Sequence, residues 1–148
     1  MPNPSTFEIL AALKEDCTST GVPYALAKAV CQCESGLRQY STSGTTLTSS
    51  AGCLGLMQLS PLTALDYNCN PHNWRENIRG GVLHLAKLLQ LFGGSSLIPD
   101  EVIAAYNHGQ GAVKKKMVRF GSSWRSRLPK ETRDYLSRVR ARMAEAST

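Results

Sequence analysis

Apolar residues recur at steps of three and four along most of this chain, which is the spacing of one buried face of an α-helix. A capping box formed by Ser5 and Glu8 starts the first expected helix, which ends between Thr18 and Gly21. Further helices are expected over 23–35, 60–66, 76–92, 99–107, 111–120 and 129–144, with a loop over 121–128. Nearly every element is therefore helical.

One long segment interrupts the helical pattern. Residues 36–53 are rich in Ser, Thr and Gly and carry few charges. Loops of this length inside a compact domain are usually functional. We expect a small β-hairpin or a loop that lines a cleft, with a flexible linker as the alternative. The many hydroxyl groups suit a polyhydroxylated substrate such as a sugar.

The expected helix over 76–92 has a clear apolar stripe but contains two glycines in its interior. Each glycine costs a helix about 1 kcal/mol relative to alanine. Gly80 and Gly81 therefore predict that another helix packs closely against this one. Gly93 and Gly94 are expected to end it.

Composition is that of a folded globular protein. Hydrophobic residues make up 42% of the chain and charged residues 19%, and no repeat or domain boundary is visible. We expect residues 1–148 to form one domain, all-helical or mostly helical with at most a small hairpin. No apolar run approaches the roughly 20 residues needed to cross a bilayer. The first residues lack the basic and apolar segments of a secretion signal, so we expect a chain made without a signal or one whose signal is missing here.

Charge is unevenly distributed. The net charge is +6, and from Lys114 onward 11 Lys and Arg face three acids, which gives +8. Such a segment can bind nucleic acid or an anionic envelope, or can be a solvated face. Arg138, Arg140 and Arg142 fall on several sides of a helix, so no single stripe is available to read nucleic acid, and we expect no nucleic-acid partner.

The cysteines do not form a metal-binding pattern. There are five of them, Cys17, Cys31, Cys33, Cys53 and Cys69, and no C-x-x-C pair exists that would form a zinc site with His72 or His84. We expect no metal and no organic cofactor. Buried small side chains are the default reading, and one disulfide, for example between Cys53 and Cys69, is compatible with the spacing.

Glu34 is the principal candidate for chemistry. It lies at the end of an apolar helical run, and the 23 residues from Ser35 to Met57 contain no carboxylate. An apolar surrounding disfavours the charged form of a carboxyl and raises its pKa, which suits a general acid. The alternative is an ordinary surface acid at a helix end.

Four short motifs, in order, resemble those of the soluble lytic transglycosylases, which belong to the goose-type-lysozyme-like superfamily. They are Glu34-Ser35-Gly36, Gly55-Leu56-Met57-Gln58-Leu59, Ala104-Ala105-Tyr106-Asn107-His108-Gly109 and Glu131-Thr132-Arg133-Asp134-Tyr135. The likeness covers roughly residues 20–140. It implies a lysozyme-like fold, mainly α or α+β with at most a small hairpin.

The resemblance also implies roles for individual residues. Glu34 would be the catalytic acid and base, and Ser35, Met57, Gln58, Tyr106, Asn107 and Tyr135 would bind substrate. Tyr106 would hydrogen-bond Glu34 or the substrate, and Tyr135 would approach from the last helix. Core filling by Met57 and a half-buried aromatic role for Tyr106 are the alternatives.

The sequence departs from the family pattern at two places. Ser60 stands where the family often has Met. The loop over 36–53 is longer than in many members, so the serine that matches the family's cleft serine is ambiguous among Ser41, Ser43, Ser49 and Ser50.

The expected activity is cleavage of the β-1,4 bond between N-acetylmuramic acid and N-acetylglucosamine in peptidoglycan, with formation of a 1,6-anhydro ring. Most glycosidases use two carboxylates, but the remaining acids considered, Asp66, Glu76, Asp100 and Glu101, are expected at helix starts or on the surface. A single acid that acts first as donor and then as acceptor fits this arrangement. A hydrolytic goose-type muramidase is one alternative, with Asp66 or Glu76 as its base. A non-catalytic glycan-binding or structural module of a tail or secretion machine is the other.

The expected partners follow from this activity. They are peptidoglycan glycan strands, with anionic envelope polymers as a further candidate, and the chain is expected to act as a monomer at the bacterial cell wall or periplasm. Without a visible signal it would be phage-borne, released at lysis, or separated from its own signal.

Overall fold

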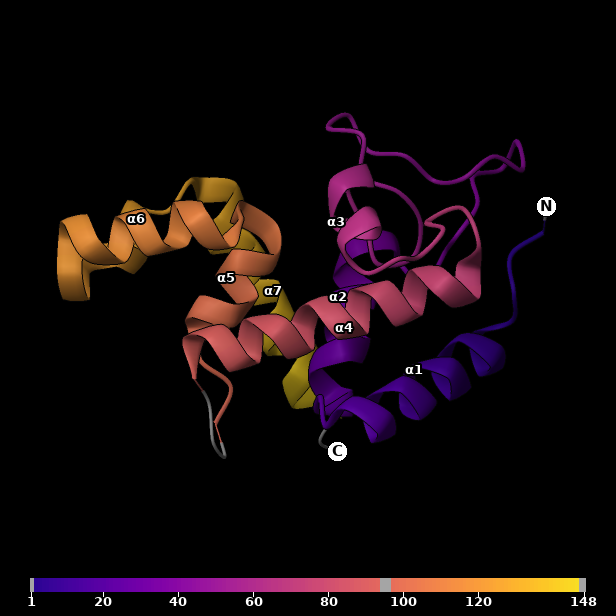
Figure 1. The fold of residues 1–148 in the computed structure, drawn as a ribbon, viewed down its shortest axis with the longest axis horizontal. Helices are drawn as coiled ribbons and strands as arrows, with labels where there is room; N and C mark the ends of the chain where they lie inside the picture. Colours follow the sequence, from indigo (N-terminus) through magenta and orange to yellow (C-terminus); the bar gives the residue numbers. More distant parts are fainter. Residues whose placement is uncertain (1, 94–96, 147–148) are drawn as a thin grey trace.

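The computed structural model describes residues 2–93 and 97–146, and helices dominate it (Figure 1). In chain order the elements are α1 (Thr6–Thr20), α2 (Tyr24–Ser35), α3 (Pro61–Asp66), α4 (Trp74–Phe92), α5 (Asp100–His108), α6 (Gln110–Phe120), the 3₁₀ helix η1 (Gly121–Arg127) and α7 (Lys130–Ala146). The mainly helical class expected from the sequence is confirmed.

Local sequence accounts for where the helices begin and end. Ser5 and Glu8 form the expected capping box at the start of α1, and Gly21 ends that helix in the left-handed conformation. Ser60 caps α3, which begins with Pro61. Asn73 caps α4, which therefore starts two residues before the predicted Glu76.

Helix α2 is the centre of the packing. It packs against α7 and α1, while α4 packs against α1 and α5. In Figure 1, α4 crosses the front of the molecule, α1 lies below it, and α6 projects away from the other helices at the left. The inner face of α2 is fully buried at Leu26, Ala27 and Val30. The end of α2 is consequently held in place by the core.

The hydroxyl-rich segment over 36–53 forms no extended strand among the described residues. Isolated antiparallel bridges instead join Tyr40 to Thr46, Thr48 to Leu54, and Leu54 to Leu59. The segment folds back on itself as a loop above the end of α2 (Figure 1). The expected hairpin is reduced to these single bridges.

Two expectations need correction. The close approach at Gly80 and Gly81 is made by loop residues rather than by another helix: a Cβ at Gly80 would lie 2.9 Å from Leu59 Cδ1, and one at Gly81 would lie 2.5 Å from Met57 Cβ. Residues 121–127 were expected as a loop and form η1.

Gly93 follows α4 as expected, and Gly94 lies outside the described residues. None of the described helices is long and apolar enough to cross a membrane.

Substitution of Gly81 by alanine should destabilise the fold. The gain in helix propensity is about 1 kcal/mol, but the new methyl group would overlap Met57 Cβ, and overpacking typically costs about 1–3 kcal/mol. Gly111→Ala in α6 is the matched control, because its Cβ would meet no atom within 4 Å. Urea unfolding of the two variants should show a loss of stability for Gly81→Ala and a gain of up to about 1 kcal/mol for Gly111→Ala. Equal effects would contradict the close packing of Met57 on α4.

Candidate active site

Glu34 occupies the last turn of α2, where the helix ends at the left-handed Gly36 (φ 64°). The turn is reinforced by Ser35, whose hydroxyl donates to the Cys31 carbonyl (3.2 Å) and accepts from the Arg38 amide (3.3 Å). Ser35 is buried, so its hydroxyl supports the helix end and is not presented to a ligand. This placement argues against the expected contact between Ser35 and substrate.

The environment of Glu34 favours the protonated carboxyl. Burial raises its pKa from 4.5 to about 7, and Glu131 raises it further by charge repulsion, whereas Tyr135 and Arg138 lower it. Desolvation is the largest of these effects. Glu34 therefore holds its proton near neutral pH and can also release it there, as the sequence reasoning required of a general acid.

Tyr135 comes to this site from α7 and is almost fully buried. Its hydroxyl lies close enough to the Glu34 carboxyl to interact with it. Burial raises the pKa of Tyr135 well above its ordinary value, and the Glu34 charge raises it further. The contact falls short of full hydrogen-bond geometry, so Tyr135 Oη is a buried hydroxyl with no hydrogen-bond partner in the described part of the chain. A buried hydroxyl of this kind is costly unless a water or ligand completes it.

The segment Leu54–Leu59 lies against the end of α2 and carries Gln58. Leu54 and Leu59 exchange backbone hydrogen bonds (2.8 and 3.0 Å), which closes a tight turn. Gln58 adopts a left-handed backbone (φ 51°), and its side-chain amide donates to the Gly55 carbonyl (2.9 Å). The strained backbone is held because both flanking residues are buried.

Two buried amide side chains hold this segment, and sequence reasoning missed both. Gln39 Oε1 accepts from the Leu56 amide (2.9 Å), and Asn77 Oδ1 accepts from the Met57 amide (2.8 Å). Each side-chain NH₂ group also donates to the Pro71 carbonyl (2.9 Å). In the sequence both residues look like ordinary surface amides, and no local signal distinguishes them.

Tyr106 reaches the segment from α5. Its hydroxyl donates to the Met57 carbonyl (2.6 Å) rather than to Glu34, so the expected hydrogen bond to Glu34 is not found among the described residues. Burial raises the pKa of Tyr106 well above its ordinary value, and the Glu34 charge raises it further. Met57 itself is completely buried and packs on α4, so its side chain fills the core.

The His84 ring lies next to the Tyr106 ring. Its ring lies 5.5 Å from the Tyr106 ring, and its Nδ1 is 2.9 Å from the Tyr67 hydroxyl. Burial lowers the pKa of His84 to about 4, so the ring is neutral at neutral pH. His84 therefore supports Tyr106 as an uncharged aromatic.

A pocket of about 270 Å³ opens beside Tyr106. It is lined by Cys53, Gln58, Leu59, Ser60, Thr63, His84, Ala105, Tyr106, Asn107, His108 and Gly109. Asn107 accepts a hydrogen bond from Thr132 of α7 (2.8 Å) through Oδ1, which fixes the orientation of its amide. Glu34 is not part of this lining. Gln58, Tyr106 and Asn107 are thus brought together in one pocket.

The loop serines do not resolve the ambiguity noted in the sequence. Ser41 and Ser43 share hydrogen bonds with each other and with Thr45, and Ser49 accepts from the Cys53 amide (3.1 Å). These hydroxyls are used within the loop.

Three of the remaining acids, among them the two expected as alternative bases, Asp66 and Glu76, have partners of their own or are exposed. Glu76 accepts from the Asn70 amide (3.0 Å), and Asp100 pairs with Arg125 and Arg140. Asp66 is exposed at the end of α3. The carboxylate whose charge raises the pKa of Glu34 is Glu131, in the first turn of α7. Glu131 belongs to the fourth sequence motif but was not expected as a base.

The cysteines are all free thiols, so the disulfide between Cys53 and Cys69 that the spacing allowed is not formed. No group of three or more His, Cys, Asp or Glu side chains that could hold a metal ion occurs within 2–93 and 97–146.

The amino-acid sequence matches a known protein family. The family model of the transglycosylase SLT domain matches residues 12–126, which is most of the chain and includes Glu34, Gln58 and Tyr106. The match ends before Tyr135, which comes from α7.

Solved structures of lytic transglycosylases share the fold. The 70-kDa soluble lytic transglycosylase of Escherichia coli superposes with a TM-score of 0.72, and a complex of the 70-kDa soluble lytic transglycosylase with bulgecin A with 0.74. An inactive glutamate-to-glutamine mutant of the lytic transglycosylase Slt from Pseudomonas aeruginosa gives 0.70. Each is 24% identical and matches 90% of this chain, but the chain spans only 23% of the length of each.

The raised pKa of Glu34 has a consequence for stability. The unfolded chain loses this proton near pH 4.5, whereas the folded chain keeps it up to about pH 7. As the pH rises through this window the folded state therefore loses up to about 3 kcal/mol relative to the unfolded state. Glu34→Gln removes the titration, so this variant should be more stable than the unmodified protein at pH 8 and equally stable below pH 4.5. Urea unfolding at both pH values tests this, and a difference that does not depend on pH would contradict the assignment.

Proposed function

We propose, since this chain belongs to the transglycosylase SLT domain family, that it is a lytic transglycosylase that cleaves the β-1,4 bond between N-acetylmuramic acid and N-acetylglucosamine in peptidoglycan. The observation that carries the proposal is Glu34, a carboxyl at the buried end of α2 whose pKa of about 7 suits both donation and acceptance of a proton. The resemblance of Glu34-Ser35-Gly36 to the family's first motif implies the same role for Glu34.

In the first step, protonated Glu34 donates its proton to the glycosidic oxygen, and the bond from that oxygen to the anomeric carbon of muramic acid breaks. The N-acetyl carbonyl of the same sugar supports the positive charge that develops at the anomeric carbon. Glu34 is left as a carboxylate. Repulsion from Glu131 and burial favour the protonated starting state, and Arg138 stabilises the charged state that follows.

In the second step, the Glu34 carboxylate takes the proton of the 6-hydroxyl of the same sugar. The 6-oxygen then attacks the anomeric carbon and closes the 1,6-anhydro ring, so no water is consumed and Glu34 regains its proton. An intramolecular hydroxyl competes well with water because little further entropy is lost when it reacts. No metal or cofactor takes part in either step.

The neighbouring residues would position the sugar. Tyr135 Oη is buried and lies close to Glu34, so it would support the Glu34 carboxylate that the first step leaves rather than contact the sugar. Gln58 and Asn107 line the pocket next to Tyr106 and offer amide groups to the glycan. Tyr106 would act mainly by fixing the Met57 carbonyl and the wall of the pocket.

The hydrolytic alternative, a goose-type muramidase, now has a specific candidate base. Glu131 is exposed and close enough for its charge to act on Glu34. If it activated a water molecule, the product would carry a reducing muramic acid end. We favour the lyase because Glu34 alone can supply both proton transfers, and because Glu131 stands in the exposed first turn of α7.

The products of digestion test the proposal. Muropeptides released from purified peptidoglycan should carry 1,6-anhydro-muramic acid ends, which are one water lighter than hydrolytic ends and are unchanged by borohydride. Glu34→Gln should lower the rate by at least about 100-fold, because the amide can neither give nor take the proton. Mass spectrometry and a turbidity assay give the two readouts.

Glu131→Gln is the control that separates lyase from hydrolase. It should leave the anhydro ends in place. Reducing ends from the unmodified protein that disappear in Glu131→Gln would establish the muramidase instead. Binding to peptidoglycan without any cleavage would favour the non-catalytic module.

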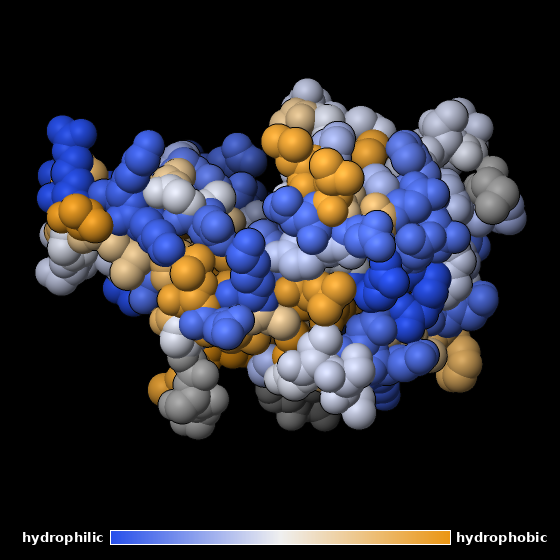
Figure 2. Space-filling view, in the orientation of Figure 1, coloured by the Kyte–Doolittle hydropathy of each residue, from blue (hydrophilic) through white to orange (hydrophobic). Residues whose placement is uncertain are grey.

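We further propose that the chain acts at the bacterial cell wall and that its basic segment binds anionic envelope polymers. Six Lys and Arg and no acid occur between residues 110 and 127. Figure 2 shows a largely hydrophilic surface over α6, the helix that projects from the molecule. Lys114 and Lys115 are exposed on this helix.

Binding to envelope material should therefore weaken as salt rises, since screening shortens to about 8 Å at physiological ionic strength. A variant with Lys114, Lys115 and Lys116 changed to glutamine should sediment less with anionic cell walls at low salt. A variant with Lys14, Lys28 and Lys87 changed to glutamine loses the same charge from other helices and is the control. Equal sedimentation of the two variants would leave α6 as a solvated face only.

A further inference from the structure

A second pocket lies between the hydroxyl-rich loop over 36–53 and the turn over 70–73. It has a volume of about 550 Å³ and is lined by Tyr40, Gly44, Thr45, Thr46, Thr48 and His72. Among the described residues, none of these also lines the pocket beside Tyr106, so the two pockets are separate. The volume is typical of a small-molecule site, and the proposed chemistry does not use it.

Both walls of this pocket are held by the rest of the molecule. On the loop side, the Gln39 and Tyr40 amides donate to Asn3 Oδ1 (2.8 Å each). An antiparallel bridge then joins Tyr40 to Thr46. On the turn side, the Tyr40 hydroxyl donates to the His72 carbonyl (3.4 Å). Tyr40 is itself buried, so the pocket is built on the fold.

The His72 ring supplies a polar group that a ligand can reach. Its Nδ1 lies 2.8 Å from Thr46 Oγ1, a contact that joins the two walls. The ring is exposed and makes no other hydrogen bond within the described part of the chain, so Nε2 is left for a ligand. A sugar hydroxyl both donates and accepts, and it can therefore pair with Nε2 in either tautomer of the ring.

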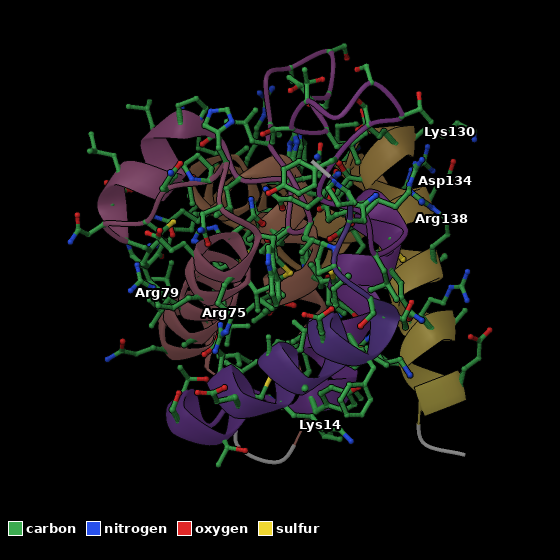
Figure 3. The ribbon with its side chains drawn as sticks, turned by 90° about the vertical axis from the view of Figure 1, so that its right-hand side faces the viewer. Lys14, Arg75, Arg79, Lys130, Asp134 and Arg138 are labelled. Carbon is green, nitrogen blue, oxygen red and sulfur yellow. The ribbon has the colours of Figure 1, made fainter. Side chains whose placement is uncertain are left out.

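The pocket offers hydroxyl groups rather than charged side chains. Three threonines line it, and no Lys, Arg, Asp or Glu occurs among its described lining residues. In Figure 3 the loop stands at the top of the molecule, and the six labelled charged residues come from α1, α4 and α7. A phosphate or carboxylate would find no Lys or Arg among these lining residues. Such a lining matches an uncharged ligand that carries many hydroxyl groups.

We propose that this pocket binds the N-acetylglucosamine residues of a glycan strand, at a place separate from the cleavage site. The inference rests on the proposed function, because it takes peptidoglycan as the polymer that brings these sugars. N-acetylglucosamine is the uncharged sugar of the repeat, whereas muramic acid bears the acidic group to which the peptides are attached. Its hydroxyl and acetamido groups can pair with the threonine hydroxyls and with His72 Nε2. Binding here holds the protein on the cell wall while Glu34 acts on a bond elsewhere.

Chitotetraose, an uncharged oligomer of N-acetylglucosamine, is the probe. Titrated into Glu34→Gln, it should shift the NMR signals of the His72 ring, which a second spectrum with His72→Ala identifies. Thr46→Val in the Glu34→Gln background removes one hydroxyl and should raise the Kd measured at His72 by about fivefold, the effect of one hydrogen bond. Thr46→Ser keeps the hydroxyl and should bind as the background protein does.

Thr42→Val is the matched control. Thr42 is exposed in the same loop but does not line the pocket, so this variant should leave the Kd unchanged. A rise in salt concentration should also leave it unchanged, because the pocket binds through hydroxyl groups. The proposed binding of envelope polymers to the basic segment should weaken under the same conditions.

Cleavage of insoluble cell walls gives a second readout. His72→Ala should lower the rate on intact walls at low protein concentration, because the protein leaves the wall sooner. The same variant should cleave short soluble strands as the unmodified protein does, since Glu34 and the pocket beside Tyr106 are untouched.

Failure of this inference differs from failure of the proposed function. If chitotetraose leaves the His72 signals unmoved, the pocket does not bind the sugar, although anhydro ends released by the unmodified protein would still support the proposed function. Equal weakening by Thr46→Val and Thr42→Val would also overturn the inference, because the effect would then belong to the loop as a whole. If the unmodified protein does not cleave peptidoglycan, the proposed function fails, whereas a saturable shift at His72 would still establish the sugar site.

Discussion

The hydrogen bonds from Gln39 and Asn77 to the Leu54–Leu59 segment are the constraint on which the site depends. This segment passes through the core without a strand or helix partner for Leu56 and Met57, and buried backbone amides left unpaired would cost about 1–3 kcal/mol each. The two side-chain amides supply these partners. A Cβ at Gly55 would collide with both of them, which accounts for glycine at that position.

The geometry of the proposed catalytic residues follows from that anchoring. With the Met57 amide fixed by Asn77, its carbonyl is held where the Tyr106 hydroxyl can donate to it. The Leu56 carbonyl likewise meets the Cys31 thiol of α2 (3.6 Å), which sets the segment against the end of the helix that carries Glu34. A loop far from Glu34 in sequence is therefore held against the helix that carries it. Rigid support of this kind is what a catalytic group requires.

The sequence predicted correctly those features that depend on interactions between residues close together in the chain. Helix periodicity and caps such as Ser5 and Ser60 depend on neighbouring residues, so the order and approximate bounds of the helices could be read directly. The resemblance of the motifs singled out Glu34 as the candidate acid, and its raised pKa was also expected from its position at the end of an apolar helix. Gln39 and Asn77 could not be found in this way, because a buried amide and a surface amide have the same local sequence signature and differ only in their tertiary partners.

The environment of Glu34 is consistent with the proposal that one carboxyl serves as both acid and base. Desolvation and Glu131 favour the neutral carboxyl, while Arg138 and the Tyr135 hydroxyl favour the carboxylate. Without Arg138 and the Tyr135 hydroxyl, burial would keep Glu34 protonated. Glu34 could then not accept the proton of the sugar's 6-hydroxyl in the proposed second step. Without burial, Arg138 and Tyr135 would keep Glu34 ionised. Glu34 could then not donate a proton to the glycosidic oxygen in the proposed first step. The opposing effects bring its pKa to about 7, where both states are accessible at neutral pH. The same balance makes Arg138 costly to remove, since it helps to hold the charged form of Glu34 within reach.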